Sequence, residues 1–444
     1  MNRESTDNRA ADAVVRTAPH GAESAADVLV ALVRRFLPLH RLGWAFLLAW
    51  VFCVFYTDAV NGYLGSDAED LMQVDIASTL LYLMVPLGST VITLLVIIFG
   101  ERRFGSPDSH LPVVLAAPII SAVGTPLLFN MAGPIALQNA LFFAGAVLVG
   151  VGSALLWVMW GSYYTHLDHS DIEFCAPVSA IIAILLVFTV SSIDGALSLV
   201  IATSFPLISG VCLIFALRAD SAGAPEEGRT LAARQLAHDR NLLDKAHEGA
   251  RRTPFSALRT MGRVGIGIFL TCMAICIGEE FWLAAHAGTP LFQAMLLAAA
   301  ALVIIVALSS TRAARHVSMV FLFRWMCPLL LFAYACLIWG YASWGTPVAA
   351  TISFASRFAF FVMTQMYFAY FASSGRVTPT QSYGFGWLFV HLGDFAGVVF
   401  AIVLGSYFTP GSETPTGLCA GLMLAIACAS MVVVGIKENF SGAG

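Results

Sequence analysis

Long apolar runs, each about the length of one membrane crossing, recur along the whole chain. An α-helix needs roughly 20 apolar residues to cross about 30 Å of hydrocarbon. The composition agrees with this pattern, because 59% of the residues are hydrophobic and only 11% are charged. Hydropathy therefore predicts an all-α, polytopic membrane protein with about twelve transmembrane helices. The predicted spans are 42–63, 75–99, 111–128, 137–160, 173–194, 196–217, 263–286, 288–311, 316–343, 345–372, 383–408 and 415–436.

The positions of the 23 Lys and Arg residues orient these spans. Apart from Arg324 and Arg357, which lie within apolar runs, the basic residues fall on one side of the predicted membrane. The loops on the opposite side contain acidic residues such as Asp67 and Glu413 and no Lys or Arg. Basic residues accumulate in cytoplasmic loops. We therefore expect a multi-pass protein of the cytoplasmic (inner) membrane with both termini in the cytoplasm.

The composition argues against nucleic-acid binding, nucleotide hydrolysis and catalysis. The formal net charge is −4, and neither of the two lysines, Lys245 and Lys437, follows a glycine as a phosphate-binding loop requires. The nine cysteines include no C-x-x-C pair, and no nucleophile–base set is evident. We expect a protein that is not an enzyme and that holds no metal or cofactor. The expected partners are the lipid bilayer and a small-molecule solute.

Polar segments divide the chain. The N-terminal segment has the composition of a disordered tail. The apolar segment after it is too short to cross a bilayer, and is either an interfacial helix or a cytoplasmic extension of the first span. The segment between the sixth and seventh spans is too short to form its own core. The predicted parts are a tail at 1–26, a juxtamembrane helix at 27–41, a six-helix bundle at 42–217, a cytoplasmic connector at 218–262, a six-helix bundle at 263–436 and a tail at 437–444.

The loop between the second and third spans carries a family resemblance. It reads Gly100-Glu101-Arg102-Arg103-Phe104-Gly105, and the loop after the eighth span keeps basic residues in Ser310-Thr311-Arg312-Ala313-Ala314-Arg315. With six spans on each side of a cytoplasmic connector, this pattern resembles the major facilitator superfamily of secondary transporters, with compressed spacing and Glu101 in place of the usual Asp. The resemblance implies two six-helix bundles related by a pseudo-twofold axis and a substrate site between them.

A second resemblance is carried by two shorter segments. Trp157-Val158-Met159-Trp160-Gly161-Ser162-Tyr163-Tyr164 ends the fourth span, and the segment from Phe385 to Gly397 opens the eleventh. Both are similar to the twelve-span membrane domains that precede a LuxR-type helix-turn-helix in actinobacterial regulators, which are regarded as receptors. The resemblance implies a ligand-sensing membrane domain. Because the sequence ends shortly after its last span, we expect no DNA-binding module in this polypeptide.

Two charged residues lie near the middle of neighbouring spans. Arg357 in the tenth span and Asp394 in the eleventh are at similar depth, so they are expected to pair. In one interpretation the pair only holds two helices together. In the other, Arg357 binds a substrate anion while Asp394 accepts a proton or releases the arginine. His391, one helical turn from Asp394, and Gln365, near Arg357, are further candidates.

Glu279 and Glu280 lie deep in the seventh span. Adjacent helical residues point about 100° apart, so we expect at most one of them to face a central site. They either bind protons there or lie together in an outer vestibule close to water. In the N-terminal half, Trp157 is the leading aromatic candidate for contact with a solute, although packing explains most such residues equally well. The glycines of Gly393-x-x-x-Gly397 and Gly417-x-x-x-Gly421 are predicted to let helices pack closely.

Two functions follow from these patterns. The first is a secondary active transporter that moves a small, anionic or amphipathic organic solute by alternating access, coupled to protons. The second is a membrane receptor that binds such a solute and signals through a cytoplasmic or separately encoded partner. The altered gating loops favour the receptor, and the absence of an effector segment from the sequence favours the transporter.

Overall fold

The computed structural model describes residues 39–56, 76–129, 132–193, 196–222, 254–286, 290–313, 319–339, 345–375, 377–407 and 413–435. The chain forms two compact units, Met1–Leu39 and His40–Gly444, and the α-helices described below belong to the second. The predicted tails at 1–26 and 437–444 lie outside the described residues. So do nearly all of the predicted juxtamembrane helix at 27–41 and the greater part of the connector at 218–262.

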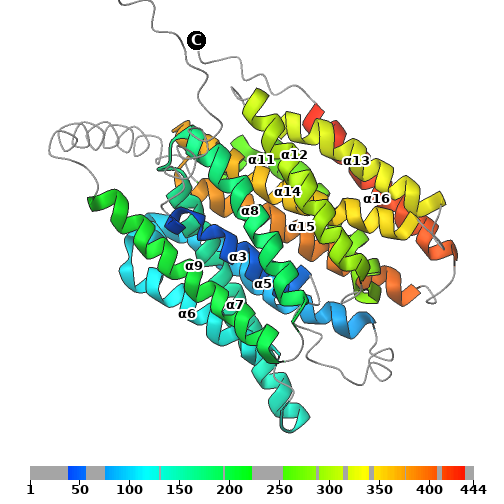
Figure 1. Ribbon diagram of the computed structural model, residues 1–444, viewed down its shortest axis with the longest axis horizontal. Helices are drawn as coiled ribbons and strands as arrows, with labels where there is room; N and C mark the ends of the chain where they lie inside the picture. The colour runs from blue at the N-terminus through cyan, green and yellow to red at the C-terminus, as the bar shows by residue number, and fades with distance from the viewer. Residues whose placement is uncertain are drawn as a thin grey trace, which may run out of the picture. The chain divides into compact units, whose positions relative to one another are not determined.

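Each predicted span overlaps one α-helix, and the described residues contain twelve α-helices (Figure 1). Eight of them are long and apolar enough to cross a membrane over their described residues. The helices of the N-terminal half are α3 (Trp44–Val51), which continues as the π-helical η2 (Phe52–Tyr56), α5 (Ile76–Phe104), α6 (Leu111–Leu128), α7 (Ile135–Tyr164), α8 (His169–Ser191) and α9 (Ala196–Ala222). Those of the C-terminal half are α11 (Pro254–His286), α12 (Pro290–Ala313), α13 (Met319–Trp339), α14 (Gly345–Ser373), α15 (Pro379–Tyr407) and α16 (Glu413–Gly435).

Prolines set the start of several helices. The first residues of α11, α12 and α15 are Pro254, Pro290 and Pro379. Proline is favoured at this position because its fixed φ suits a helix and the missing N–H has no partner in the first turn anyway. Hydropathy placed the starts of the seventh and eleventh spans later, at 263 and 383. These helices extend beyond the predicted apolar spans, because polar sequence can continue a helix without entering the hydrocarbon.

The two halves pack by the same plan. In the N-terminal half, α3 packs on α8 and α9, and α7 packs on α5 and α6. In the C-terminal half the corresponding helices repeat these pairs, with α11 on α15 and α16, and α14 on α12 and α13. Between the halves, α5 packs on α15 and α8 packs on α12. These two pairs are equivalent, because α5 corresponds to α12 and α8 corresponds to α15. The chain is therefore two six-helix bundles related by a pseudo-twofold axis.

Close packing of α15 on α11 depends on glycine. A Cβ atom on Gly393 would lie 2.5 Å from the carbonyl oxygen of Phe269, and one on Gly397 would lie 2.7 Å from the Cβ of Cys276. The prediction for Gly393-x-x-x-Gly397 is confirmed. For Gly417 and Gly421 the prediction was wrong as far as the described residues go, because none comes within 4 Å of a Cβ on either glycine.

Candidate functional site

Three buried charged side chains from three helices meet between α11, α14 and α15. The Nε of Arg357 donates a hydrogen bond of 2.6 Å to Oε2 of Glu279, and its Nη1 donates one of 2.9 Å to Oδ1 of Asp394. The three residues are between 0% and 3% exposed. We call Glu279, Arg357 and Asp394 the charged triad. The close approach of α15 to α11 at Gly393 brings the carboxylates of both helices to one guanidinium.

The structure tests the geometric part of the predictions for these residues. The expected pairing of Arg357 with Asp394 is confirmed. For Glu279 the outer-vestibule alternative was wrong, because its carboxylate is buried and bound to Arg357. Glu280 is in α11 directly after Glu279, but its side chain lies outside the described residues. The roles of these residues in binding or coupling stay predictions.

The charged triad holds two carboxylates and one guanidinium. When all three groups are ionised their charges sum to −1. A net charge at membrane depth is costly, since the surroundings have a low dielectric constant and water is excluded. Within the triad the carboxylates outnumber the guanidinium, and Arg357 and Asp394 also make interactions beyond these two bonds.

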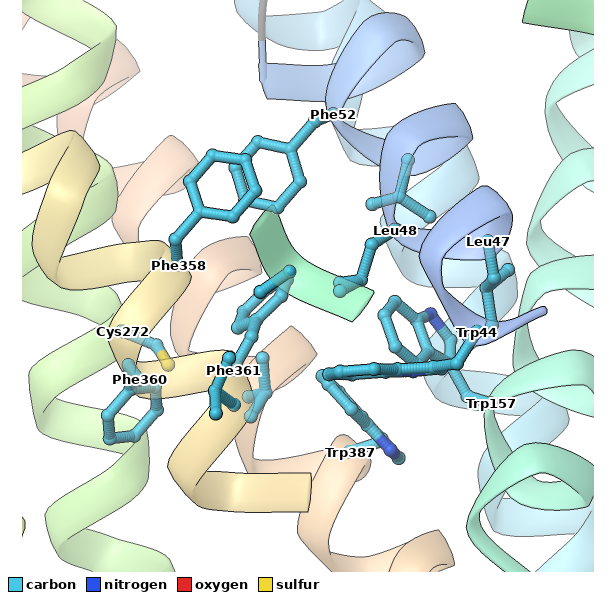
Figure 2. Close-up of a cluster of buried hydrophobic side chains, with 14 of the residues drawn as sticks. Trp44, Leu47, Leu48, Phe52, Trp157, Cys272, Phe358, Phe360, Phe361 and Trp387 are labelled. Carbon is cyan, nitrogen blue, oxygen red and sulfur yellow. The ribbon is translucent and has the colours of Figure 1, made fainter. Parts of the chain in front are cut away.

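Aromatic rings follow Arg357 by one helical turn on α14 and precede Asp394 by one to two turns on α15. The indoles of Trp157 and Trp387 stack with ring centroids 3.8 Å apart and planes inclined by 29°. His391 lies 6.0 Å from Trp387 and 6.4 Å from Trp157, centroid to centroid. Phe361 meets both indoles edge-on, and Trp44 meets Trp157 edge-on. We call Trp44, Trp157, Phe361, Trp387 and His391 the aromatic box, and Figure 2 labels four of them.

The aromatic box joins the two halves. Trp44 and Trp157 come from α3 and α7, whereas Phe361, Trp387 and His391 come from α14 and α15. Beside the box, Phe52 stacks on Phe358 at 3.7 Å, again between one residue of each half (Figure 2). Phe52 begins the π-helical segment of the first span, and such segments are frequent at functional sites. Helices of both halves thus meet through rings at the centre of the molecule.

Several polar atoms around the aromatic box are buried without a hydrogen bond from any described residue. They are both ring nitrogens of His391, both side-chain polar atoms of Gln365 and the indole nitrogens of Trp157 and Trp387. Gln365 is 0% exposed and His391 is 4% exposed. Buried polar groups normally have partners, and a cluster of exceptions calls for an explanation. A bound solute that offers hydrogen-bonding atoms would provide one.

Two other tryptophans of the N-terminal half do not belong to this centre. The indole of Trp50 donates a hydrogen bond to Thr125, and that of Trp160 donates one to Ser209, both inside the N-terminal half. These tryptophans stabilise their own bundle. Sequence reasoning did not assign a role to Trp387, although a signal was present. Trp387, His391 and Asp394 recur at helical spacing on one face of α15.

The two segments with the receptor-like resemblance contact each other. Trp157 of the first stacks on Trp387 of the second, and a Cβ on Gly161 would collide with the ring of Tyr383, which lies just before the second segment on α15. The hydroxyl of Tyr383 in turn donates to the backbone oxygen of Gln365 at 2.9 Å. Glycine at 161 is therefore required for the close approach of α7 and α15.

Polar links connect the halves at the end of the helices where the loop 100–105 lies. Thr378 donates to Glu101 at 2.9 Å, and Tyr370 donates to Glu173 at 3.0 Å. The hydroxyls of Thr380 and Ser106 are 3.0 Å apart. These contacts link the two halves at this end.

No protein-family model matches the chain, and no curated protein matches it by sequence. Solved structures do match. The xylose transporter XylE from E. coli, in a partially occluded inward-open conformation, superposes with a TM-score of 0.59 at 14% identity, covering 92% of this chain and 98% of that one. An auto-inhibited POT family peptide transporter gives 0.57 at 12% identity, with 93% and 99% covered. The human organic anion transporter MFSD10 gives 0.56 at 16% identity, with 89% and 99% covered. The chain therefore has the fold of the major facilitator superfamily.

Proposed function

We propose that this protein is a secondary active transporter that moves a small organic solute by alternating access, with the charged triad coupling that movement to protons. The observation that carries the proposal is the buried triad itself, in which two carboxylates share one guanidinium at the level where the two halves meet. The transporter fold supports it, because solute sites in such folds lie near the midplane between the halves.

Proton coupling follows from the charge of the triad. One proton on Glu279 or Asp394 makes the triad neutral and leaves Arg357 one ionised partner. Loss of that proton leaves the triad with a negative charge again. Binding of the proton is therefore linked to the conformational change that exposes the triad to one side of the membrane or the other. The titratable side chains around it are Cys272 and Cys276 on α11, Tyr334 on α13 and His391 on α15.

The solute contacts in this proposal come from the aromatic box. Its rings suit the apolar part of an amphipathic solute, and the buried atoms of Gln365 and His391 suit its polar part. An anionic solute, as the sequence predicted, would have to draw Arg357 away from a carboxylate that already binds it. Protonation of that carboxylate would free the guanidinium for the anion.

Proteoliposomes test the proposal. We would impose a gradient of a two-ring probe, either 1-naphthoate or N-methylquinolinium, and record the internal pH with a trapped dye. We expect a probe-dependent pH change that Glu279→Gln and Asp394→Asn abolish and that Trp50→Phe, outside the site, keeps. Probe binding without any pH change above that of empty vesicles would reject coupled transport.

The receptor is a second candidate, favoured by how tightly the halves interlock. The ring of Tyr383 fills the space above Gly161, and two aromatic stacks cross between the halves. A solute that binds between these rings and separates them would change the conformation of the protein without crossing the membrane. In that case a cytoplasmic or separately encoded partner would read the change, and the same vesicle experiment would show binding without flux.

The proposal includes a location and an orientation. The charge alternation of the loops supports a cytoplasmic (inner) membrane protein with both termini in the cytoplasm. It also supports domain boundaries at 42–217 and 263–436 with a cytoplasmic connector at 218–262. In this orientation the end closed by Glu101, Thr378, Tyr370 and Glu173 is the cytoplasmic end.

A further inference from the structure

We infer that an anionic phospholipid binds to the exposed surface where α5 and α11 meet, with its phosphate held by arginines from both halves of the molecule. The surface lies away from the charged triad, and the inference does not depend on solute transport. It depends on two exposed rings that touch across the halves and on exposed arginines that follow them at helical spacing. We call Phe99, Arg103, Phe255, Arg259 and Arg263 the basic seam.

Two phenylalanine rings join α5 to α11 at the basic seam. The ring centroids of Phe99 and Phe255 are 6.0 Å apart, although the two residues are 48% and 67% exposed. The exposed face of α5 continues from Phe99 through Val96 and Ile92, which are 63% and 62% exposed. Acyl chains can therefore cover this face while the headgroup lies beyond the rings. Because α5 belongs to the N-terminal half and α11 to the C-terminal half, a lipid bound here contacts both.

The arginines lie on the same helix faces as the two rings. Arg103 follows Phe99 by four residues on α5. On α11, Arg259 and Arg263 follow Phe255 by four and eight residues. Residues at this spacing share one face of a helix, and all three arginines are exposed. The contact of the rings thus places basic side chains of both halves along one seam.

Within the described residues, no acid balances these charges. The described salt bridges all lie elsewhere, and none includes an arginine of the basic seam. Glu101 is the only acid of α5, and it accepts a hydrogen bond from Thr378 on α15. The first acid of α11 is Glu279, which belongs to the charged triad. An anion from outside the chain is therefore the natural partner of the arginines.

The depth of Arg263 favours a lipid over a free anion. At 1.5 Å per residue, Arg263 lies about 12 Å further along α11 than Phe255, toward the middle of the membrane. A guanidinium exposed to hydrocarbon is costly, and its long side chain can extend back toward the interface. In that position it lies on the same side of α11 as Arg259, and a phosphate can accept hydrogen bonds from both guanidinium groups. Acyl chains hold the phosphate of a phospholipid at this level, whereas inorganic phosphate stays in water.

The sign of the charge selects among phospholipids. Three arginines without an acid attract a headgroup of net negative charge, such as that of phosphatidylglycerol. They repel the ammonium group of phosphatidylcholine, which cancels the charge of its own phosphate. In the proposed orientation the basic seam faces the cytoplasmic leaflet, whose surface potential is negative because of its anionic lipids.

Titration of the purified full chain in a neutral detergent tests the inference. The probes are palmitoyl-oleoyl phosphatidylglycerol, phosphatidylcholine with the same acyl chains, and inorganic phosphate. Native mass spectrometry counts the bound lipids, and the unfolding temperature reports the stabilisation that a ligand gives to the folded state. We expect phosphatidylglycerol to bind at least about tenfold more tightly than phosphatidylcholine. Inorganic phosphate should leave the unfolding temperature unchanged.

Three variants locate the site. Arg259→Gln combined with Arg263→Gln should weaken phosphatidylglycerol at least about tenfold, because two charge-assisted contacts are lost. Arg103→Gln should weaken it about threefold or more, because the contact from the other half is lost. The matched control is Arg218→Gln, which should leave binding unchanged. Arg218 is an exposed arginine at the end of α9, one turn from the exposed Phe215, and α9 packs on helices of its own half.

The unfolding temperature of each variant without lipid establishes that it is folded. Equal affinity for phosphatidylcholine, or equal stabilisation by inorganic phosphate, overturns the inference. A loss of binding in Arg218→Gln as large as in the double variant also overturns it, because the general positive charge of this end would then account for the binding. Unchanged binding in Arg103→Gln rejects a site shared by the two halves.

Discussion

At the scale of single residues, Arg357 and its two partners are not equivalent. Removal of the guanidinium leaves two buried carboxylates without their cation, whereas removal of one carboxylate leaves a neutral pair. We expect Arg357→Ala to lower the free energy of unfolding by about 3–5 kcal/mol, and Glu279→Gln to change it by less than about 1.5 kcal/mol. Thermal unfolding in detergent or nanodiscs measures both.

The double change Arg357→Ala with Asp394→Ala is the control for this prediction. It removes one of the two carboxylates that Arg357→Ala leaves unpaired, so it should be less destabilised than Arg357→Ala alone. Equal loss in Arg357→Ala and Glu279→Gln would mean that packing, and not charge balance, determines stability at this site.

The sequence allows part of the triad to be predicted. The depths of Arg357 and Asp394 can be counted along neighbouring spans, and their pairing follows from that count. The participation of Glu279 depends on the rotation of α11 about its axis, which apolar sequence on all sides of the helix does not specify. The aromatic box is more difficult to predict from the sequence. A tryptophan that packs inside one bundle, such as Trp50, cannot be distinguished by sequence from one that stacks across the halves, such as Trp157.

At the scale of helices, glycine determines how closely α15 approaches α11. Gly393→Ala places a methyl group 2.5 Å from the carbonyl oxygen of Phe269, whereas Gly421→Ala meets no described residue within 4 Å. We expect Gly393→Ala to be destabilised by about 1–3 kcal/mol relative to the wild type and Gly421→Ala to be nearly neutral. Thermal unfolding of the two variants side by side checks this. A neutral Gly393→Ala would mean that α15 can shift away from α11 at little cost.

Hydropathy locates the helices well and their ends less well. The third span was predicted at 111–128, which are the bounds of α6, because both of its ends coincide with a change from polar to apolar sequence. The α11 helix begins before the predicted apolar span, since helix formation continues through basic sequence that would not enter a bilayer. Hydrogen bonding and proline, and not lipid, set such ends.

At the scale of the whole molecule, a few hydrogen bonds connect the halves at the end where the loop 100–105 lies. Tyr370→Phe removes the bond to Glu173 and leaves the ring in place. A hydrogen bond to a charged acceptor contributes roughly 1.5–3 kcal/mol. We therefore expect the population that is open at this end to rise about tenfold or more. Distances between spin labels at Ser109 and Ser374, on opposite halves, measure that population.

The matched control is Ser373→Ala. Its hydroxyl bonds only to the backbone of Tyr370, within the same helix, so its removal should leave the distance distribution unchanged. If the distances between the spin labels are also unchanged in Tyr370→Phe, this hydrogen bond does not keep the halves together at this end. Packing of α5 on α15 and of α8 on α12 would then do so.

All members of the charged triad belong to one half of the molecule. If the two bundles separate as the proposed function requires, α11, α14 and α15 travel together, and the bonds of Arg357 to Glu279 and Asp394 do not have to break. The Trp157–Trp387 stack, in contrast, has one ring on each bundle and must come apart. In the proposed transport cycle the stacked rings therefore contribute to the kinetic barrier between conformations, whereas the charged triad stays intact inside one bundle. Substitutions of the rings and substitutions of the charged residues are then expected to affect different steps of that cycle.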